Sequence, residues 1–292
     1  MVESVSREDP DYPEQLKGIK GAPDLLYFIG DLGLCRMPCA AIVGSRKCTT
    51  YGKWAAAQLA RSAANAGIAV ISGMALGIDT AAHRGALESG GKTIAVLGGG
   101  VDVCYPPSNR QLYEEIMDKG LLLAEQPPGQ APLPGMFPAR NRIISGLSRT
   151  VVVVEAGSHS GSLITAELAL HQNREVCAVP GNINCITSFG ANKLIQDGAT
   201  PIVVPSDLPQ IMGISDPSMI RRMEEERGKG EICLSETERG ILEILKDGRE
   251  YTRSELCSAL QMDAKKMGAM VTILEMKGFL QTDLGKIYIA KK

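Results

Sequence analysis

Short apolar runs alternate with longer helical stretches between residues 40 and 204. The runs are apolar throughout rather than at every second position, which is typical of parallel strands covered by helices on both faces of a sheet. They occupy residues 40–43, 68–71, 93–97, 121–124, 150–154, 176–179 and 201–204. Candidate helices lie near residues 50–66, 77–89, 108–118, 139–148, 160–172 and 189–197. The pattern predicts an α/β domain over residues 40–205, with an extended, Rossmann-like, doubly wound and mostly parallel sheet.

The pattern changes on both sides of this block. Residues 1–39 show little periodicity and are interpreted as an N-terminal extension packed onto the main domain. Residues 206–232 carry prolines and then the charged run 221–227, which predicts a linker or a solvated helix.

Residues 233–292 predict a second, small domain. A capping-box pair, Ser235 and Glu238, opens the first of three candidate helices. These helices, near residues 235–246, 252–260 and 263–277, precede a hairpin. The order is typical of a winged helix-turn-helix, and such a domain serves equally well to contact a protein or to read DNA.

Composition favours a cytoplasmic protein that does not enter the membrane. No apolar run reaches the roughly 20 residues that span a bilayer, and the polar N-terminus does not resemble a signal peptide. The eight cysteines include no C-x-x-C pair, so we expect reduced thiols and no metal site. Net charge is −2, but residues 40–205 carry 13 basic and 11 acidic residues, net +2. Any affinity for nucleic acid must therefore come from a local cleft.

Glycine- and serine-rich turns follow four of the predicted strands. Since ligands of open α/β sheets bind beyond the carboxyl ends of the strands, these turns form the candidate site. Together they predict a shelf of backbone N–H groups for phosphate, although any one of them alone would favour a simple tight turn. The candidate residues of these turns are Gly44, Ser45 and Arg46, then Ser72 and Gly73, and then Ser160, Gly161 and Ser162.

Known nucleotide fingerprints are missing from these turns. No G-x-G-x-x-G follows the first strand, and the glycines before Lys92 have the wrong spacing for a phosphate-binding loop and lead into a strand. We therefore expect no cofactor.

A proline-rich loop over residues 125–139 supplies the remaining candidates. It ends in Phe137, followed by Arg140, Asn141 and Arg142. Aromatic stacking on bases combined with arginine contacts to phosphate is typical of single-strand binding. In a helix the two arginines would diverge by about 200°, so both face one ligand only if this segment is loop. The alternative is that Phe137 fills the core and one arginine braces the loop.

Few residues are arranged as catalytic groups would be, so we expect that the protein is not an enzyme. Asp79 and His83, four residues apart, fit a structural carboxylate–imidazole contact better than an acid–base pair. His159 and Ser160 are adjacent, which is not the geometry of a nucleophile and its base.

The turns taken together resemble the DNA-processing protein A (DprA/Smf) family over about residues 40–204. The resemblance implies a protein that binds single-stranded DNA, forms a homodimer and loads RecA recombinase during natural transformation. It implies that Gly44, Ser45, Arg46, Ser72, Gly73, Phe137, Arg140, Asn141, Ser160, Gly161 and Ser162 form the DNA pocket. The matching text is Val43-Gly-Ser-Arg46, Ser72-Gly73, Gly77-Ile-Asp79-Thr-Ala-Ala-His83, Thr93 to Gly98, Tyr105-Pro106, Phe137-Pro-Ala-Arg-Asn-Arg-Ile-Ile144, Val154-Glu-Ala156, Ser160 to Ala166 and Val179-Pro-Gly181.

Two features depart from that family. Residues 1–39 are too short for the sterile-alpha-motif-like domain with which many members begin. Pro107 and Pro134 stand where some members carry basic residues, which lowers the expected positive charge of the pocket.

Two other functions remain open on the sequence. One is a Rossmann-like nucleotide phosphoribohydrolase, whose G-T-x-x-E turn is approached by Gly161-Ser162-Leu-Ile-Thr165. Here Thr165 stands in place of the glutamate, and Glu167 comes two residues late. The other is a regulator that binds duplex DNA through its winged helix.

Overall fold

The structure is a computed structural model that describes residues 1–214, 236–245, 251–260, 262–276, 279–283 and 286–289. The chain divides into two compact units, Met1–Ser215 and Asp216–Lys292. The predicted charged run 221–227 and Ser235 of the predicted capping box lie outside the described residues.

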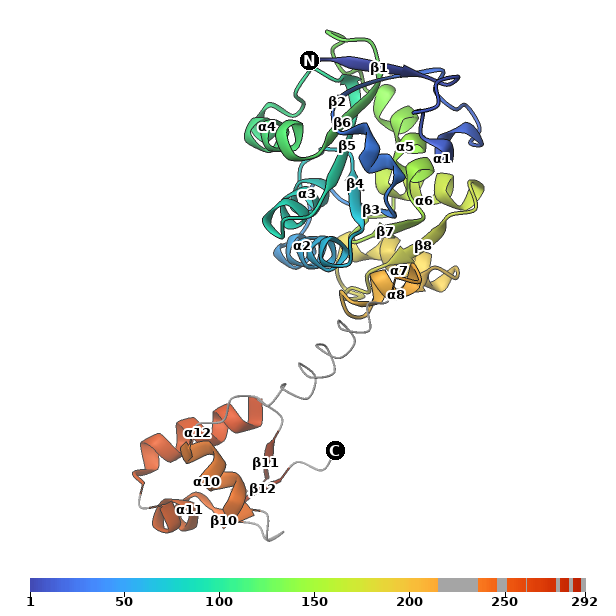
Figure 1. Ribbon diagram of the computed structural model, residues 1–292. Coiled ribbons are helices and arrows are strands. Elements are labelled where there is room, and N and C mark those ends of the chain that lie inside the picture. Colours follow the sequence, from blue (N-terminus) through green and yellow to red (C-terminus); the bar gives the residue numbers. More distant parts are fainter. Residues whose placement is uncertain (215–235, 246–250, 261, 277–278, 284–285, 290–292) are drawn as a thin grey trace. The chain divides into compact units, whose positions relative to one another are not determined.

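Within the described part of the first unit, nine strands form one sheet in the order β1-β2-β6-β5-β4-β3-β7-β8-β9 (Figure 1). Along this order, every neighbouring pair from β6 to β9, which includes β5, β4, β3, β7 and β8, is parallel. At the other end of the sheet, β2 pairs antiparallel with β6, and β1 pairs antiparallel with β2. The order β5-β4-β3-β7-β8-β9 is that of the Rossmann fold, with its reversal between β3 and β7. The strands are β1 (Glu3–Ser6), β2 (Leu25–Gly30), β3 (Cys39–Val43), β4 (Ala69–Ser72), β5 (Thr93–Gly100), β6 (Leu121–Gln126), β7 (Thr150–Val153), β8 (Glu175–Ala178) and β9 (Thr200–Pro201).

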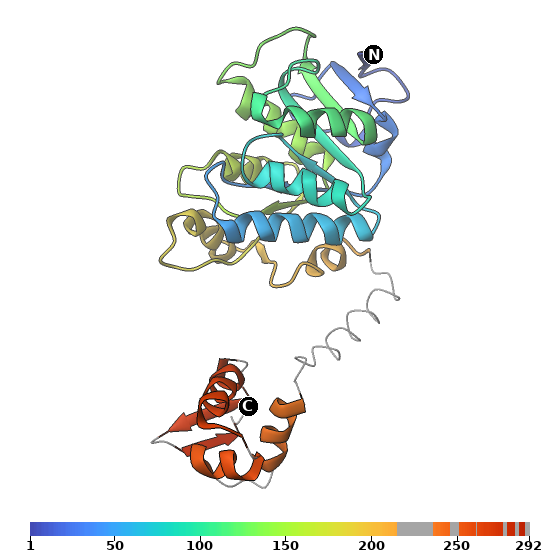
Figure 2. The ribbon, with the colours of Figure 1, turned by 90° about the vertical axis from the view of Figure 1, so that its left-hand side faces the viewer.

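Helices cover both faces of this sheet. Helices α2 (Thr50–Asn65), α3 (Ile78–Glu88) and α4 (Arg110–Lys119) lie on the face that Figure 2 views. The opposite face is covered by α1 (Glu14–Lys17), α5 (Met136–Leu147), α6 (Gly161–His171) and α7 (Phe189–Gln196). The doubly wound α/β class predicted from the apolar runs is therefore confirmed.

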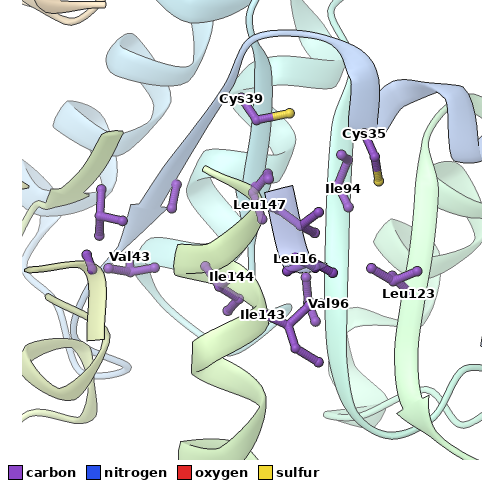
Figure 3. Close-up of a cluster of buried hydrophobic side chains, with 14 of the residues drawn as sticks. Leu16, Cys35, Cys39, Val43, Ile94, Val96, Leu123, Ile143, Ile144 and Leu147 are labelled. Atoms are coloured by element: carbon purple, nitrogen blue, oxygen red, sulfur yellow. The ribbon is translucent and has the colours of Figure 1, made fainter. Parts of the chain in front are cut away.

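The largest core cluster lies between the sheet and α5. Ile143, Ile144 and Leu147 of α5 point toward Ile94 and Val96 of β5 (Figure 3). All of these side chains are at most 2% exposed. Because α5 is fixed along this seam, its first turn is held at the carboxyl ends of the central strands.

The N-terminal segment is part of this core rather than an attachment to it. β2 pairs with β6, and β1 pairs with β2. Leu16 of α1 and Leu26 of β2 are fully buried. β1 is a four-residue strand of mixed polarity, and β2 is a continuous apolar run from Leu25 to Ile29 that the sequence analysis did not assign as a strand.

Several boundaries differ from the sequence prediction: the run predicted as a strand at 201–204 is reduced to β9 (Thr200–Pro201), and two further differences change how the sequence is interpreted. α5 begins at Met136, three residues before the predicted start, within the segment predicted as loop. The first residues of the predicted linker also belong to the first unit, because α8 (Asp207–Ile211) buries Leu208 in the core cluster beneath α2.

The second unit contains the elements that the winged-helix prediction requires. Its three-stranded antiparallel sheet has the order β10-β12-β11. Ile241, Leu256, Val271 and Ile287 share its buried core. The elements are α10 (Glu236–Leu245), β10 (Tyr251–Thr252), α11 (Arg253–Leu260), α12 (Ala264–Met276), β11 (Leu280–Asp283) and β12 (Lys286–Ile289).

None of the helices in the described ranges has both the length and the apolar character needed to cross a membrane.

Truncation of Leu16 tests whether the N-terminal segment stabilises the first unit. Leu16→Ala leaves a cavity in a fully buried site, so we expect the free energy of unfolding to fall by about 2–5 kcal/mol. The measurement is urea denaturation followed by the emission of Trp54 in α2. Ile183→Ala, at a fully exposed position, serves as the control and should change stability by less than about 0.5 kcal/mol. Equal effects of the two substitutions would mean that the segment adds nothing to the core.

Candidate functional site

A pocket of about 660 Å³ opens where the strand order reverses, at the carboxyl ends of β3 and β7. Its walls are the loop after β3, the segment after β4, the first turns of α5 and the N-terminus of α6. This is the position at which doubly wound sheets bind ligands. The predicted residues that line it are Gly44, Ser45, Arg46, Phe137, Arg140, Asn141, Ser160, Gly161 and Ser162.

Close packing shapes the loop after β3. The Ser45 backbone N–H donates to the Glu155 carbonyl (2.7 Å), and the Ser45 carbonyl accepts from the Ile78 N–H (3.3 Å). A Cβ on Gly44 would lie 2.6 Å from the Ile78 side chain, so this position admits no side chain. Gly77 has φ +82° and lies against the carbonyls of Ser45 and Arg46. The two glycines therefore fix the turn that presents Arg46.

Arg46 and Phe137 meet at the mouth of the pocket. The guanidinium carbon of Arg46 lies 5.3 Å from the centre of the Phe137 ring, within the range of a cation–π contact. Tyr105 completes an aromatic wall, with its ring centre 5.6 Å from that of Phe137. Arg46 is exposed and Phe137 is half-buried. An exposed arginine beside an aromatic ring is the combination of side chains that the sequence analysis associated with binding of a single strand.

Phe137 belongs to helix α5, whereas the sequence placed it in a loop. Pro138 lies in the first turn of α5, where a proline removes no helical hydrogen bond. The prolines of this segment therefore suggested a loop at residues where the helix has already begun. The ring packs against Gly98, where a Cβ would lie 2.8 Å from Phe137 Cδ1. Phe137 therefore lines the pocket and does not fill the core, which was the alternative considered from the sequence.

Arg140 forms the floor of the pocket and is only 6% exposed. Its guanidinium donates to the Val96 carbonyl in the middle of β5. A Cβ on Gly73 would lie 2.1 Å from Arg140 Nη1, so Gly73 provides the room for this side chain. Burial lowers the pKa of Arg140 to about 10, which leaves it a cation at neutral pH. Its Nε is buried without a hydrogen-bond partner in the described part of the chain.

Asp79 and Ser72 support this floor from below. The Asp79 carboxylate accepts from the backbone N–H groups of Gly73 (3.1 Å) and Ala75 (3.3 Å). Burial raises the pKa of Asp79, and the nearby Arg140 opposes that rise. Ser72 is fully buried and donates to the Ile42 carbonyl (2.7 Å), so it does not reach the pocket.

Arg142 points away from the pocket, in contrast to the DNA contact predicted for it. Its guanidinium bonds the Glu125 carboxylate (2.5 Å) and the Gly21 carbonyl (2.8 Å). Because α5 is already helical here, Arg140 and Arg142 diverge as helical geometry requires. Arg142 instead fastens the N-terminal segment to α5.

The N-terminus of α6 forms the opposite wall. Ser160 caps the helix by accepting from the Ser162 N–H (3.4 Å), and Asn141 Nδ2 donates to the Gly161 carbonyl (3.4 Å). A helix N-terminus carries partial positive charge and favours an anion. The pocket therefore joins this partial charge to the cations Arg46, Lys47 and Arg140.

The lining also includes residues that were not among the predicted site residues, and Lys47, Tyr105 and Thr165 are three of them. Lys47 follows Arg46 directly, and Tyr105 belongs to a Tyr-Pro pair that the sequence comparison had already matched. The position of Lys47 next to Arg46 could therefore have identified it as a site residue from the sequence. Nothing in the local sequence indicates that Tyr105 folds back onto Phe137.

Of the residues considered for catalysis, Asp79 and Ser160 line the pocket, and both accept hydrogen bonds from backbone N–H groups. Glu167 is exposed on α6 and lies 3.9 Å from His171. Glu155 is 2% exposed, and its carboxylate accepts from the Thr49 N–H (2.8 Å) and hydroxyl (2.5 Å). No set of three His, Cys, Asp or Glu side chains that could hold a metal occurs in the described ranges.

Asp79 and His83 do not form the contact expected between them. The His83 Nδ1 lies 2.7 Å from the Thr93 hydroxyl, while Asp79 serves the backbone of residues 73 and 75. Burial lowers the pKa of His83 to about 3, and its Nε2 has no hydrogen-bond partner in the described residues.

A family model for DNA recombination-mediator protein A matches residues 3–213. The chain belongs to this family. DprA of Streptococcus pneumoniae is 46% identical over 205 residues, which cover 70% of this chain and 72% of that protein. Smf of Synechocystis is 43% identical over 213 residues, which cover 72% of this chain and 54% of that protein.

Solved structures of the family share the fold of the first unit. The Streptococcus pneumoniae DprA structure gives a TM-score of 0.69 over 70% of this chain and 72% of its own. The structure of Helicobacter pylori DprA, which is 32% identical in sequence, gives a TM-score of 0.67 over 73% of this chain and 95% of its own. The latter structure describes a single-stranded DNA binding mode of that protein. The DprA/Smf resemblance seen in the sequence is thus confirmed.

The buried His83 makes stability depend on pH. Between pH 6.5 and about 3 the unfolded chain binds a proton on this side chain that the folded chain does not, so stability falls as pH decreases through this window. From pH 7 to pH 5 we expect the protein to lose about 2 kcal/mol more unfolding free energy than the His83→Asn variant. Urea denaturation at the two pH values measures the difference. His171→Asn, at an exposed ring on α6, is the control and should follow the unsubstituted protein. Parallel pH profiles for His83→Asn and the unsubstituted protein would contradict this account.

Proposed function

We propose that this chain binds single-stranded DNA in the pocket between α5 and α6. The observation that carries the proposal is the Arg46 guanidinium 5.3 Å from the Phe137 ring at the pocket mouth. A flexible single strand exposes both its phosphates and the faces of its bases, and this pair of side chains matches both. The description of Helicobacter pylori DprA as a single-strand binder supports the same reading.

The proposed contacts follow from charge and exposure. Arg46 and Lys47 are exposed cations at the rim and are suited to phosphate oxygens. Phe137 and Tyr105 offer ring faces to bases. The α6 N-terminus, with Ser160 and Ser162, accommodates a further phosphate. Arg140 contributes its positive charge from the floor.

The cellular role is proposed from the family. A recombination mediator in this family is expected to pass its bound strand to RecA recombinase, to act as a homodimer in the cytoplasm and to serve natural transformation. The membership itself supports this proposal, together with the relatives named DprA. The second unit is proposed to be a winged helix that contacts either a protein or DNA.

Substitutions at the pocket mouth test the DNA site. Oligo-dT should bind with micromolar affinity or better and should weaken as salt rises. Phe137→Ala removes a stacking face and should weaken binding by about 1–3 kcal/mol. Arg46→Ala removes a phosphate contact and should also lower the salt slope by about 0.7. Fluorescence anisotropy over a salt series measures both effects.

Matched variants separate the site from general effects. Phe137→Tyr keeps the ring and should retain affinity. Arg61→Ala removes an exposed arginine from the far half of α2, where it pairs only weakly with Glu88 (3.8 Å), and should bind like the unsubstituted protein. Unaffected Arg46→Ala and Phe137→Ala variants, or equal affinity for duplex, would overturn the proposal.

We also propose that the pocket catalyses no reaction. The carboxylates beside it are occupied, Asp79 by two backbone N–H groups and Glu155 by Thr49. Glu167, the residue nearest to the glutamate of a phosphoribohydrolase turn, is exposed on α6 and does not line the pocket.

Incubation with nucleoside monophosphates tests this second proposal. Chromatography should show no free base above the level of a protein-free sample, because no carboxylate is free at the pocket to assist departure of the base. Base release that disappears in Glu167→Gln would instead establish the phosphoribohydrolase alternative.

A further inference from the structure

Two exposed aromatic rings stand on the first turns of α2, outside the pocket described above. Tyr51 is 48% exposed and Trp54 is 55% exposed. Their ring centres lie 6.1 Å apart with an interplanar angle of 29°, a stacked arrangement. Trp54 is the only tryptophan of the chain. Large aromatic rings are usually well buried, so an exposed stacked pair offers apolar faces to a ligand.

The rings are held on a rigid base. Thr49 caps α2 by accepting from the Gly52 N–H (3.1 Å). The N–H and hydroxyl of Thr49 in turn donate to the buried Glu155 carboxylate. A Cβ on Gly52 would lie 2.5 Å from that carboxyl carbon, so the helix start sits directly on Glu155. Because the base is fixed, little ordering accompanies binding at these rings.

A second cavity connects the rings to the same edge of the sheet. It has a volume of about 580 Å³ and is lined by Tyr51, Thr49, Glu155 and the segment after β8. The Glu155 carbonyl meanwhile accepts from Ser45 in the wall of the DNA pocket. Glu155, which lines the second cavity, is therefore hydrogen-bonded to Ser45, which lines the first.

The charge around the rings favours a polyanion. Residues 32–78, which include both rings, contain no aspartate or glutamate, and the basic residues nearest to the rings in the sequence are Arg46, Lys47 and Lys53. Lys47 and Lys53 are exposed and flank Tyr51 in the sequence. The one acid in the cavity wall, Glu155, is 2% exposed and hydrogen-bonded. Cations beside stacked aromatic faces suit a single-stranded nucleic acid.

We propose that Tyr51 and Trp54 form a second stacking site, on which a base of the single strand rests after the strand leaves the Arg46–Phe137 pocket. Lys47 and Lys53 hold the intervening phosphates. This inference rests on the proposed function and extends its footprint along the carboxyl edge from α5 to α2.

The single tryptophan reports directly on this site. A dT oligonucleotide of about 12 nucleotides should reach the rings and quench Trp54 emission in the full-length protein. Trp54→Ala should weaken binding of this oligonucleotide about 5- to 150-fold, whereas an oligonucleotide of about 4 nucleotides, held by the pocket, should bind with unchanged affinity. Trp54→Phe keeps a ring and should retain most of the affinity.

Leu170→Ala is the matched control, since Leu170 is 58% exposed on α6 and loses a similar apolar surface. Binding that requires Arg46 and Phe137 but is unchanged in Trp54→Ala would overturn the second site alone. Emission that does not respond to a saturating 12-mer would also overturn it. Emission that follows protein concentration instead of DNA would assign the rings to an interface between copies, against the proposal. Absence of any single-strand binding would overturn both sites.

Discussion

The buried guanidinium of Arg140 is the constraint on which the site depends. Burial lowers its pKa to about 10, so keeping the side chain charged in this position opposes folding by on the order of 3 kcal/mol. The Val96 carbonyl accepts from this guanidinium, the Asp79 carboxylate opposes the fall of its pKa, and Gly73 leaves the space for it. These groups come from different elements: Val96 from the middle of β5, Asp79 from the first turn of α3 and Gly73 from the segment after β4. Their convergence therefore fixes the strand ends and the first turn of α5 relative to one another.

Phe137 depends on the same arrangement, because it precedes Arg140 by one helical turn. With Arg140 anchored, the Phe137 ring is pressed against Gly98 and turned toward Arg46. A site organised in this way is formed before ligand arrives, and less conformational freedom is lost on binding. The Nε of Arg140 is buried and lacks a hydrogen-bond partner in the described residues.

Much of this arrangement was accessible from the sequence, since parallel strands buried on both faces leave continuous apolar runs. β3 to β8 produce such runs, and their carboxyl ends predicted the edge at which the pocket lies. β1 was missed because its four residues, two of them serines, leave no apolar run, whereas the run of β2 from Leu25 to Ile29 was overlooked in a segment interpreted as having little periodicity. The start of α5 was missed because Pro138 is tolerated in a first turn but reads as a loop residue. The DNA contact predicted for Arg142 was wrong for the same reason, because Arg140 and Arg142 would face one ligand only if this segment were a loop. Ser72 was misplaced for another reason, because a strand-end hydroxyl can bond the neighbouring strand instead of the ligand.

The net charge of −2 is a poor guide to what this protein binds, and the reason is screening. At about 0.1 M salt the Debye length is about 10 Å, so acidic residues elsewhere on the surface contribute little at the pocket. The two walls that carry Arg46 and Phe137 come from stretches without acids, residues 32–78 and 126–154. Asp79, the acid that enters the pocket lining, is largely neutralised by two N–H groups and by Arg140. A polyanion at this edge therefore meets a local positive field that a count over the whole chain conceals.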